Sequence, residues 1–276
     1  MDFSSRNKNE WSKILLSIAT FLAIIVIAMS LSIFLFERLK TMPLSKNEVH
    51  WKSVFWIIPL PIIGLFLFHI LRIDILSIIM LSVYALTLTL FIRALLPLNK
   101  SDIVYVPCFI ISASLVALSY VFRLFLYNNF LTLILSSTVA TILAISIGFK
   151  TSILMLAILS IYDFIAVYSG FMPAVIPKTL ELTLAPIFVI QVDGEIGLLG
   201  AGDVVFSCFI LIEFWKTKGK HYALIAFLTL ITAIGLTLFG VWYGLKIAPV
   251  LPSIFLASLV AWLLEKILKQ KGQIKK

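Results

Sequence analysis

The sequence predicts an all-α membrane protein with nine transmembrane helices, folded as a single polytopic membrane domain over residues 1–276. Its composition is 62% hydrophobic and only 13% charged, with a mean hydropathy of +1.13. A soluble domain is closer to one quarter charged, so charges this sparse cannot cover a water-facing surface of this size. Nine apolar stretches are long enough to cross a bilayer, and no internal repeat divides the chain.

Each predicted span approaches the roughly 20 apolar residues that a transmembrane helix needs. The nine spans are 14–36, 53–71, 75–96, 103–122, 129–148, 151–169, 197–215, 222–243 and 249–266. The first is too long for the core of a signal peptide and has no clear cleavage site, so we expect it to be retained. Gly148 and Lys150 separate the fifth span from the sixth, and Asn128–Asn129 mark the junction before the fifth.

The stretch 170–196 is too long and too rich in proline for a simple hairpin loop. It contains a short β-favouring run of four residues, Ile187, Phe188, Val189 and Ile190. An extended segment beside a membrane site can bind an unwound peptide by adding a strand to it. We therefore expect this run either to be a substrate-binding strand or to be an ordinary apolar re-entrant segment.

The basic residues predict the orientation of the chain. Of the 22 lysines and arginines, the N-terminus and the even-numbered loops carry seven, and the odd-numbered loops and the C-terminus carry fifteen. Because the richer side faces the cytoplasm, the N-terminus is expected outside and the C-terminus inside, in the cell membrane. Lipid headgroups explain the net charge of +9, so the expected environment is a lipid bilayer and no nucleic-acid partner is implied.

Two carboxylates, Asp163 and Asp203, lie well inside predicted spans, whereas the other acidic residues lie in loops, tails or span edges. A carboxylate at membrane depth is costly, and its default interpretation is functional. Asp163 lies about six residues before the end of the sixth span, and Asp203 about six residues after the start of the seventh. At 1.5 Å per residue, both are roughly 9 Å from the same membrane face. Each aspartate is therefore the predicted partner of the other.

Two adjacent carboxyls that share one proton are suited to hydrolysing an amide. The ionised one takes a proton from water while the protonated one polarises the peptide carbonyl. The neighbouring residues fit this chemistry, because Gly200 and Gly202 allow close backbone approach and the Tyr162 hydroxyl can bond near the site. A proline-rich motif that opens the ninth span enters from the same face and frees backbone groups there. Its residues are Pro249, Val250, Leu251 and Pro252.

Tyr-Asp in one span, Gly-x-Gly-Asp in the next and Pro-x-Leu-Pro in the ninth resemble the presenilin and signal peptide peptidase family of intramembrane aspartyl proteases. The resemblance implies cleavage of transmembrane segments or signal peptides, with Asp163 and Asp203 as the catalytic pair and Pro249 to Leu251 shaping the site. The family usually has Pro-Ala-Leu, so Val250 is a departure that is expected to narrow the site or alter substrate choice. The predicted orientation is similar to that of the signal peptide peptidase branch, and the small size to an archaeal or minimal member.

Three other functions remain open at this stage. A prepilin-type peptidase also uses a Gly-x-Gly-Asp aspartate, but it resembles a shorter chain with a basic residue soon after that aspartate. An ion-coupled transporter can use a carboxylate pair as a proton relay, and a chaperone of membrane segments needs no catalysis. A zinc or rhomboid-type serine protease is not indicated, since His-Glu-x-x-His and Gly-x-Ser-Gly with a buried histidine do not occur.

The remaining polar residues are expected to have structural roles. Cys108 and Cys208 lie in apolar runs, and the sequence implies no metal or organic cofactor. Glu213 and Glu265 are expected to pair at the surface with nearby Lys216 and Lys266. Serines and threonines in the fifth span are expected to hydrogen-bond between helices. They are Ser136, Ser137, Thr138 and Thr141.

Overall fold

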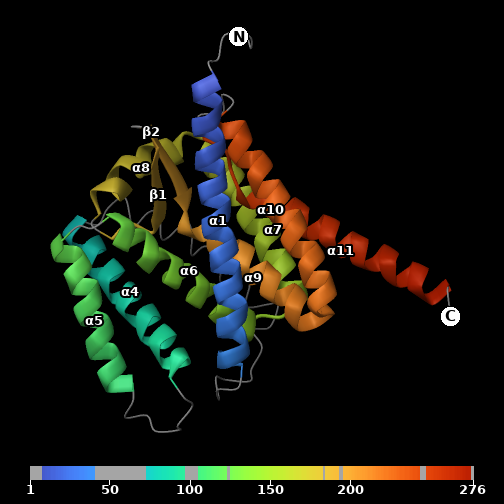
Figure 1. Ribbon diagram of the computed structural model, residues 1–276, viewed down its shortest axis with the longest axis horizontal. Helices are drawn as coiled ribbons and strands as arrows, with labels where there is room; N and C mark the ends of the chain where they lie inside the picture. The colour runs from blue at the N-terminus through green and yellow to red at the C-terminus, as the bar shows by residue number, and fades with distance from the viewer. Residues whose placement is uncertain are drawn as a thin grey trace.

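The computed structural model describes residues 8–40, 73–96, 105–122, 125–182, 184–192, 195–242 and 247–274 (Figure 1). Within these ranges, seven helices are long and apolar enough to cross a membrane. They are α1 (Lys8–Leu39), α4 (Ile73–Leu95), α5 (Tyr105–Phe122), α6 (Phe125–Ser146), α7 (Phe149–Tyr168), α10 (Lys220–Trp242) and α11 (Leu251–Ile274). The chain is thus an integral membrane protein, and these helices correspond to seven of the nine predicted spans. The predicted span 53–71 lies outside the described residues.

Two boundaries near α6 refine the expected spans. The helix begins at Phe125, so Asn128 and Asn129 lie inside its first turns and do not form a junction. It ends at Ser146, and α7 begins at Phe149 after Gly148, whose extended backbone has a φ of −89°. The predicted break between the fifth and sixth spans is therefore confirmed.

The seventh predicted span, 197–215, is wrong at its start. Residues Ile187–Val192 (β1) and Glu195–Gly200 (β2) pair as an antiparallel two-stranded sheet, and the helix that follows is α9 (Ala201–Lys218). Glycine disfavours a helix, and Gly197 and Gly200 fall within this apolar stretch. The pairing between the strands also satisfies backbone groups that a lipid environment would leave unbonded. Asp203 is consequently the third residue of α9 and does not lie six residues into a helix.

The long segment before the sheet contains a helix that was not expected. The helix α8 spans Phe171–Glu181 and follows Gly170, whose φ of 80° is the left-handed conformation that glycine adopts without strain. The β-favouring run at Ile187–Ile190 forms most of β1, as its composition predicts. The expected loop is therefore a helix followed by a hairpin.

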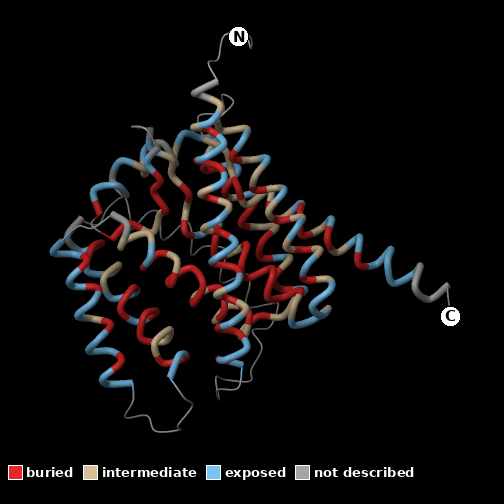
Figure 2. The backbone as a smooth tube through the Cα atoms, viewed as in Figure 1, coloured by how far each residue is buried: buried red, intermediate tan, exposed pale blue. Residues whose placement is uncertain are grey.

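Helix α9 forms the centre of the fold, and most of its residues are buried (Figure 2). The largest hydrophobic cluster joins it to side chains of α1, α6, α7, α10, α11 and both strands. Three of the four serines and threonines that were expected to bond between helices do so. Ser137 donates to the carbonyl of Ala28 on α1 at 3.2 Å, Thr141 to that of Ser32 at 3.2 Å, and Ser136 to that of Ala201 on α9 at 3.4 Å. The buried Thr138 hydroxyl has no hydrogen-bond partner among the described residues. The hairpin lies beside α1 and α6 and leads directly into α9 (Figure 1).

The glutamates at the far end of α9 and α11 are buried, so the ion pair expected for Glu213 forms away from the surface, and Glu265 has other partners than the expected one. Glu213 is fully buried, with the Lys216 ammonium 3.4 Å from its Oε1. Glu265 is 2% exposed and pairs with Lys218 at 3.2 Å and Lys269 at 2.6 Å. The predicted partner Lys266 lies over the Trp262 ring instead. Buried carboxylates need close cations. Lys216 and Lys269 lie within one turn of their glutamates on the same helix, whereas Lys218 reaches Glu265 through the packing of α9 against α11.

Candidate active site

Asp163 is held between α7 and the first turn of α11. Its side chain is 9% exposed, and the Leu251 backbone N–H donates to its Oδ2 at 3.2 Å. Leu251 is the first residue of α11, where backbone N–H groups have no partner within the helix. Ser160, one turn before Asp163 on α7, donates through its hydroxyl to the Leu251 carbonyl at 3.0 Å. The backbone N–H and the backbone carbonyl of Leu251 are thus both hydrogen-bonded to side chains of α7, at Asp163 and one turn before it.

Asp203 lies in the first turn of α9. Gly200 is the N-cap, and the Asp203 carboxyl accepts a hydrogen bond from its backbone N–H. A side chain at the third helical position that bonds back to the N-cap forms half of a capping box. The partial positive charge at a helix N-terminus also favours a carboxylate there. The last residue of β2 and the first turn of α9 therefore fix this aspartate together.

The structure brings the two aspartates together. Helix α7 packs against α9, and Asp163 lies near enough to Asp203 for their carboxyls to influence each other electrostatically. Asp163 lies five residues before α7 ends, and Asp203 two residues after α9 begins, so the two helix ends meet at one level. Two carboxyls this close are cheapest when they hold one proton between them. The pair can therefore provide one proton acceptor and one proton donor.

Tyr162 and Val250 are the sequence neighbours of Asp163 and Leu251, the two residues joined by a hydrogen bond at the site. Among the described residues, the buried Tyr162 hydroxyl has no hydrogen-bond partner, so the expected bond near the site is not formed there. Val250 is 7% exposed and belongs to the main hydrophobic cluster, and its carbonyl accepts the N–H of Ile254 to begin α11. The Val250 side chain, larger than that of alanine, packs in the core, while its backbone N–H lies at the Asp163 carboxyl. Pro249 precedes α11, and Pro252 occupies its first turn, where a missing N–H costs nothing.

The two glycines of the Gly-Ala-Gly-Asp motif have different surroundings. A Cβ at Gly200 would lie 3.1 Å from Oδ2 of Asp203, whereas a Cβ at Gly202 would meet nothing within 4 Å. We expect Gly200→Ala to displace the Asp203 carboxylate and to lower the peptide hydrolysis that the sequence predicts about tenfold or more, the size of effect expected when a catalytic group is misplaced. Gly202→Ala is the matched control and is expected to keep the wild-type melting temperature and the larger share of activity. Equal losses in the two variants would contradict this account of Gly200.

The predicted substrate strand has one edge already occupied. On β1, the Val189 N–H donates to Oδ1 of Asn129 at 3.0 Å, and Nδ2 of Asn129 donates to the Val189 carbonyl at 2.7 Å. The N–H and the carbonyl of one strand residue point to the same edge of the strand. Because those of Val189 bond to Asn129, they point away from β2. The partner of Val189 in the register, Leu198, then also points its N–H and carbonyl outward, on the far edge of β2. Sequence reasoning missed Asn129, although a polar residue within a membrane span was a usable signal.

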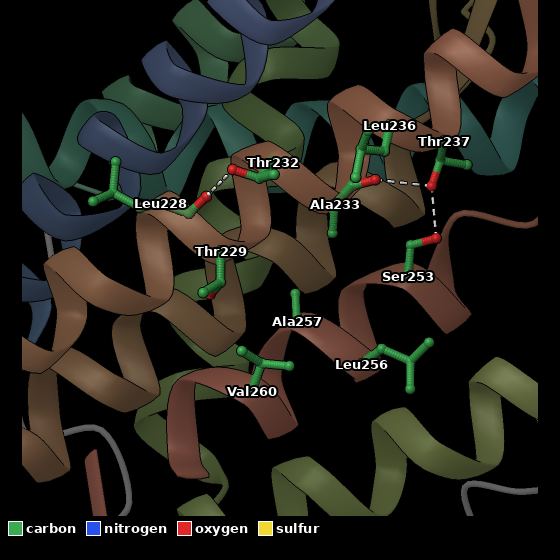
Figure 3. A pocket seen from close by; sticks show the side chains of 10 residues that line it. All are labelled: Leu228, Thr229, Thr232, Ala233, Leu236, Thr237, Ser253, Leu256, Ala257 and Val260. Atoms are coloured by element: carbon green, nitrogen blue, oxygen red, sulfur yellow. Dashed lines mark hydrogen bonds between the residues drawn. The ribbon is translucent and has the colours of Figure 1, made fainter. Parts of the chain in front are cut away.

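A groove of about 580 Å³ lies between α10 and α11 (Figure 3). Its lining is mostly apolar, and a Thr237–Ser253 hydroxyl pair, 2.6 Å apart, lies at one place along it. Neither aspartate lines this groove, although Ser253 follows the Asp163-bound Leu251 by two residues. Within the described ranges, no three His, Cys, Asp or Glu side chains gather as a metal-ion site.

Comparisons with known proteins agree with this arrangement at the level of fold. No protein-family model matches the sequence, and no curated protein matches it. Two solved structures of a presenilin family intramembrane aspartate protease, in space groups C222 and P2, superpose with TM-scores of 0.67 and 0.66. They are 16% and 14% identical to this chain, cover 91% and 90% of it, and are themselves covered over 99% and 96% of their lengths. The chain therefore has the fold of the presenilin-family intramembrane aspartate proteases, as its sequence motifs predicted.

Proposed function

We propose that this protein is a member of the presenilin and signal peptide peptidase family and an intramembrane aspartyl endopeptidase. Its substrates are transmembrane segments of proteins or signal peptides, and its catalytic pair is Asp163 and Asp203. The observation that carries the proposal is the meeting of these two carboxyls where α7, α9 and α11 converge, with Leu251 bonded to Asp163. The likeness of fold to aspartate proteases of the membrane supports it.

The proposed reaction needs only the two carboxyls and one water molecule. The ionised carboxyl accepts a proton from water as the water oxygen bonds to the peptide carbon, and the protonated carboxyl donates to the carbonyl oxygen. In the tetrahedral intermediate the carbon carries two hydroxyl groups. The protonated carboxyl then delivers a proton to the amide nitrogen while the other carboxylate takes the proton of one of the two hydroxyl groups. The C–N bond breaks, and a carboxylic acid and an amine leave. The pair ends with one shared proton, as it began.

The proposed substrate site is the open edge of the hairpin beside the dyad. A peptide bond inside a helix is not accessible to attack, so the substrate must be extended around the scissile bond. Because Asn129 occupies the outer edge of β1, we assign strand addition to β2, in place of the four-residue run on β1 that the sequence suggested. Ile196 and Leu198 present the outward backbone groups, and Ile196 is 62% exposed. An added strand at this edge would run alongside the segment that leads to Asp203.

Orientation is part of the same proposal. The excess of basic residues in the odd-numbered loops and the C-terminus supports an outer N-terminus and a cytoplasmic C-terminus in the cell membrane, for a chain that acts as one membrane domain. The site would then open toward the outer leaflet.

The experiment that tests the proposal compares hydrolysis with transport. Purified protein in liposomes is given a synthetic transmembrane peptide, and products are identified by mass spectrometry; parallel vesicles are tested for proton-coupled uptake of small solutes. We expect two complementary peptide fragments and no uptake above that of empty vesicles. Uptake abolished by loss of either aspartate, with the peptide left intact, would favour the ion-coupled carrier and contradict the proposal.

A further inference from the structure

We propose that Asn129 is a positioning residue that replaces a third strand on the hairpin, and that it thereby sets both where substrate pairs and where the peptide is cut. The inference rests on the proposed function and adds a determinant of cleavage position. Its basis is the paired hydrogen bonds between the Asn129 carboxamide and the Val189 peptide groups, 2.7 and 3.0 Å long.

The carboxamide of Asn129 reproduces what a neighbouring strand would offer. In an antiparallel sheet, one residue gives an N–H and a carbonyl to the same residue of the partner strand. Asn129 does this with one side chain, and the residue that it pairs with, Val189, is the third of six residues in β1. An unpaired strand edge is a template for another strand, and burying its groups without partners is costly in a membrane. Asn129 therefore closes β1 at its centre and leaves β2 as the edge that accepts a peptide.

Asn129 belongs to a polar stripe on α6 that is hydrogen-bonded, directly or through Tyr84, to Ala185, Val189 and Ala201. Thr132 and Ser136 follow it on the same face of the helix, and both are fully buried. Thr132 bonds the Tyr84 hydroxyl at 2.8 Å, and that hydroxyl donates to the Ala185 carbonyl at 3.1 Å. The Ser136 hydroxyl donates to the Ala201 carbonyl at 3.4 Å.

This stripe connects the hairpin to the catalytic aspartate. The Ala201 N–H donates to the Pro186 carbonyl at 3.0 Å, which closes the base of the hairpin where α9 begins. Asp203 follows two residues later. If β1 shifts along α6, β2 shifts with it, and the first turn of α9, which carries Asp203, is displaced. The same contact that excludes peptide from β1 also fixes the register of a β2-bound peptide relative to the dyad.

The test replaces the carboxamide with an apolar group of similar size. Asn129→Leu removes both bonds to Val189. Asn128→Leu is the matched control, because the Asn128 amide is 3.4 Å from the Ala185 carbonyl, which also accepts from Tyr84. Two readouts are taken on detergent-purified protein: hydrogen–deuterium exchange of the peptide that contains Val189, and the positions of cleavage in a transmembrane peptide, read by mass spectrometry.

For Asn129→Leu we expect exchange at the Val189 amide to be about tenfold faster, since one hydrogen bond protects it. We also expect the main cut to be shared with neighbouring peptide bonds, whereas a residue that only supports folding would lower the yield at an unchanged cut. Asn128→Leu should match the wild type in both readouts. Asn129→Asp keeps an acceptor for the Val189 N–H and loses the donor. Its exchange rate and its spread of cleavage positions should therefore lie between those of the wild type and of Asn129→Leu. This variant serves as the test if the leucine variant does not fold.

Wild-type exchange and wild-type cleavage positions in Asn129→Leu would overturn the inference. So would an equal change in Asn128→Leu. If the wild-type protein cleaves no peptide, the proposed function fails, but the exchange measurement still decides whether Asn129 holds β1. Cleavage by the wild type with unchanged positions in the variant would reject the role of Asn129 alone.

Discussion

Asp163→Asn and Asp203→Asn should each lower peptide hydrolysis about a thousandfold or more, within the range that general acid–base groups contribute. An asparagine can accept the hydrogen bond from Leu251 or Gly200, but it can neither take a proton from water nor donate one as a carboxylic acid does. Since the two carboxyls perform the two halves of one proton exchange, either replacement is expected to remove nearly all activity. The measurement is fragment yield from a transmembrane peptide over time.

Glu181→Gln is the matched control for exchanging a carboxyl for an amide away from the dyad. It lies at the end of α8, with an exposed side chain, and should retain wild-type activity. The aspartate variants should keep the elution volume and the thermal transition of the wild type, because each preserves the size of its side chain. A variant that retains a tenth of the activity would show that its aspartate is not one of the two catalytic groups.

Leu251→Pro is expected to lower hydrolysis about tenfold to a hundredfold, because a hydrogen bond to a charged group is worth about 1.5–3 kcal/mol. The substitution removes the backbone N–H that Asp163 accepts. Proline is well tolerated at the first position of a helix, which Leu251 occupies, so α11 should form as before. The Ser160 bond to the carbonyl of residue 251 also remains available. The measurement is kcat and KM for a transmembrane peptide.

Leu251→Ala separates the backbone group from the side chain. It shortens the leucine but keeps the N–H, so it should lose less activity than the proline variant while changing stability at least as much. Similar kcat values for the alanine and proline variants would mean that the side chain matters and the bond to Asp163 does not.

The membrane helices could be predicted because a helix that crosses the lipid bilayer needs about 20 consecutive apolar residues, and such stretches can be read directly from the sequence. Seven of the nine expected spans appear in the described residues as helices long and apolar enough to cross a membrane, and the break before α7 falls where Gly148 and Lys150 indicated. Their buried position in adjacent spans also indicated that Asp163 and Asp203 belong together, since a carboxylate in lipid requires a polar neighbour. The fold likeness that the three motifs predicted was found in the structural comparison.

The hairpin could not be predicted in full because only one of its two strands has a sequence that favours a strand by itself. The β1 run is β-favouring by itself, but β2 reads as the beginning of a helix until its partner and the close approach of Gly197 to Phe21 are known. The contact of Asn129 with Val189 joins residues 60 positions apart, and although a polar residue in a membrane span is a signal, nothing in the sequence identifies Val189 as its partner. The pair of Glu265 with Lys218 likewise depends on how α9 meets α11.

The most direct test of one catalytic site built from both aspartates is the binding of a transition-state mimic. A peptide in which the scissile amide is replaced by a hydroxyl-bearing tetrahedral carbon should bind one molecule per chain, with the hydroxyl between the two carboxyls, because an enzyme binds its transition state more tightly than its substrate. We expect Asp163→Asn and Asp203→Asn each to weaken this binding about a hundredfold, as loss of charged hydrogen bonds to a buried group implies. Wild-type affinity in either variant would contradict the shared site.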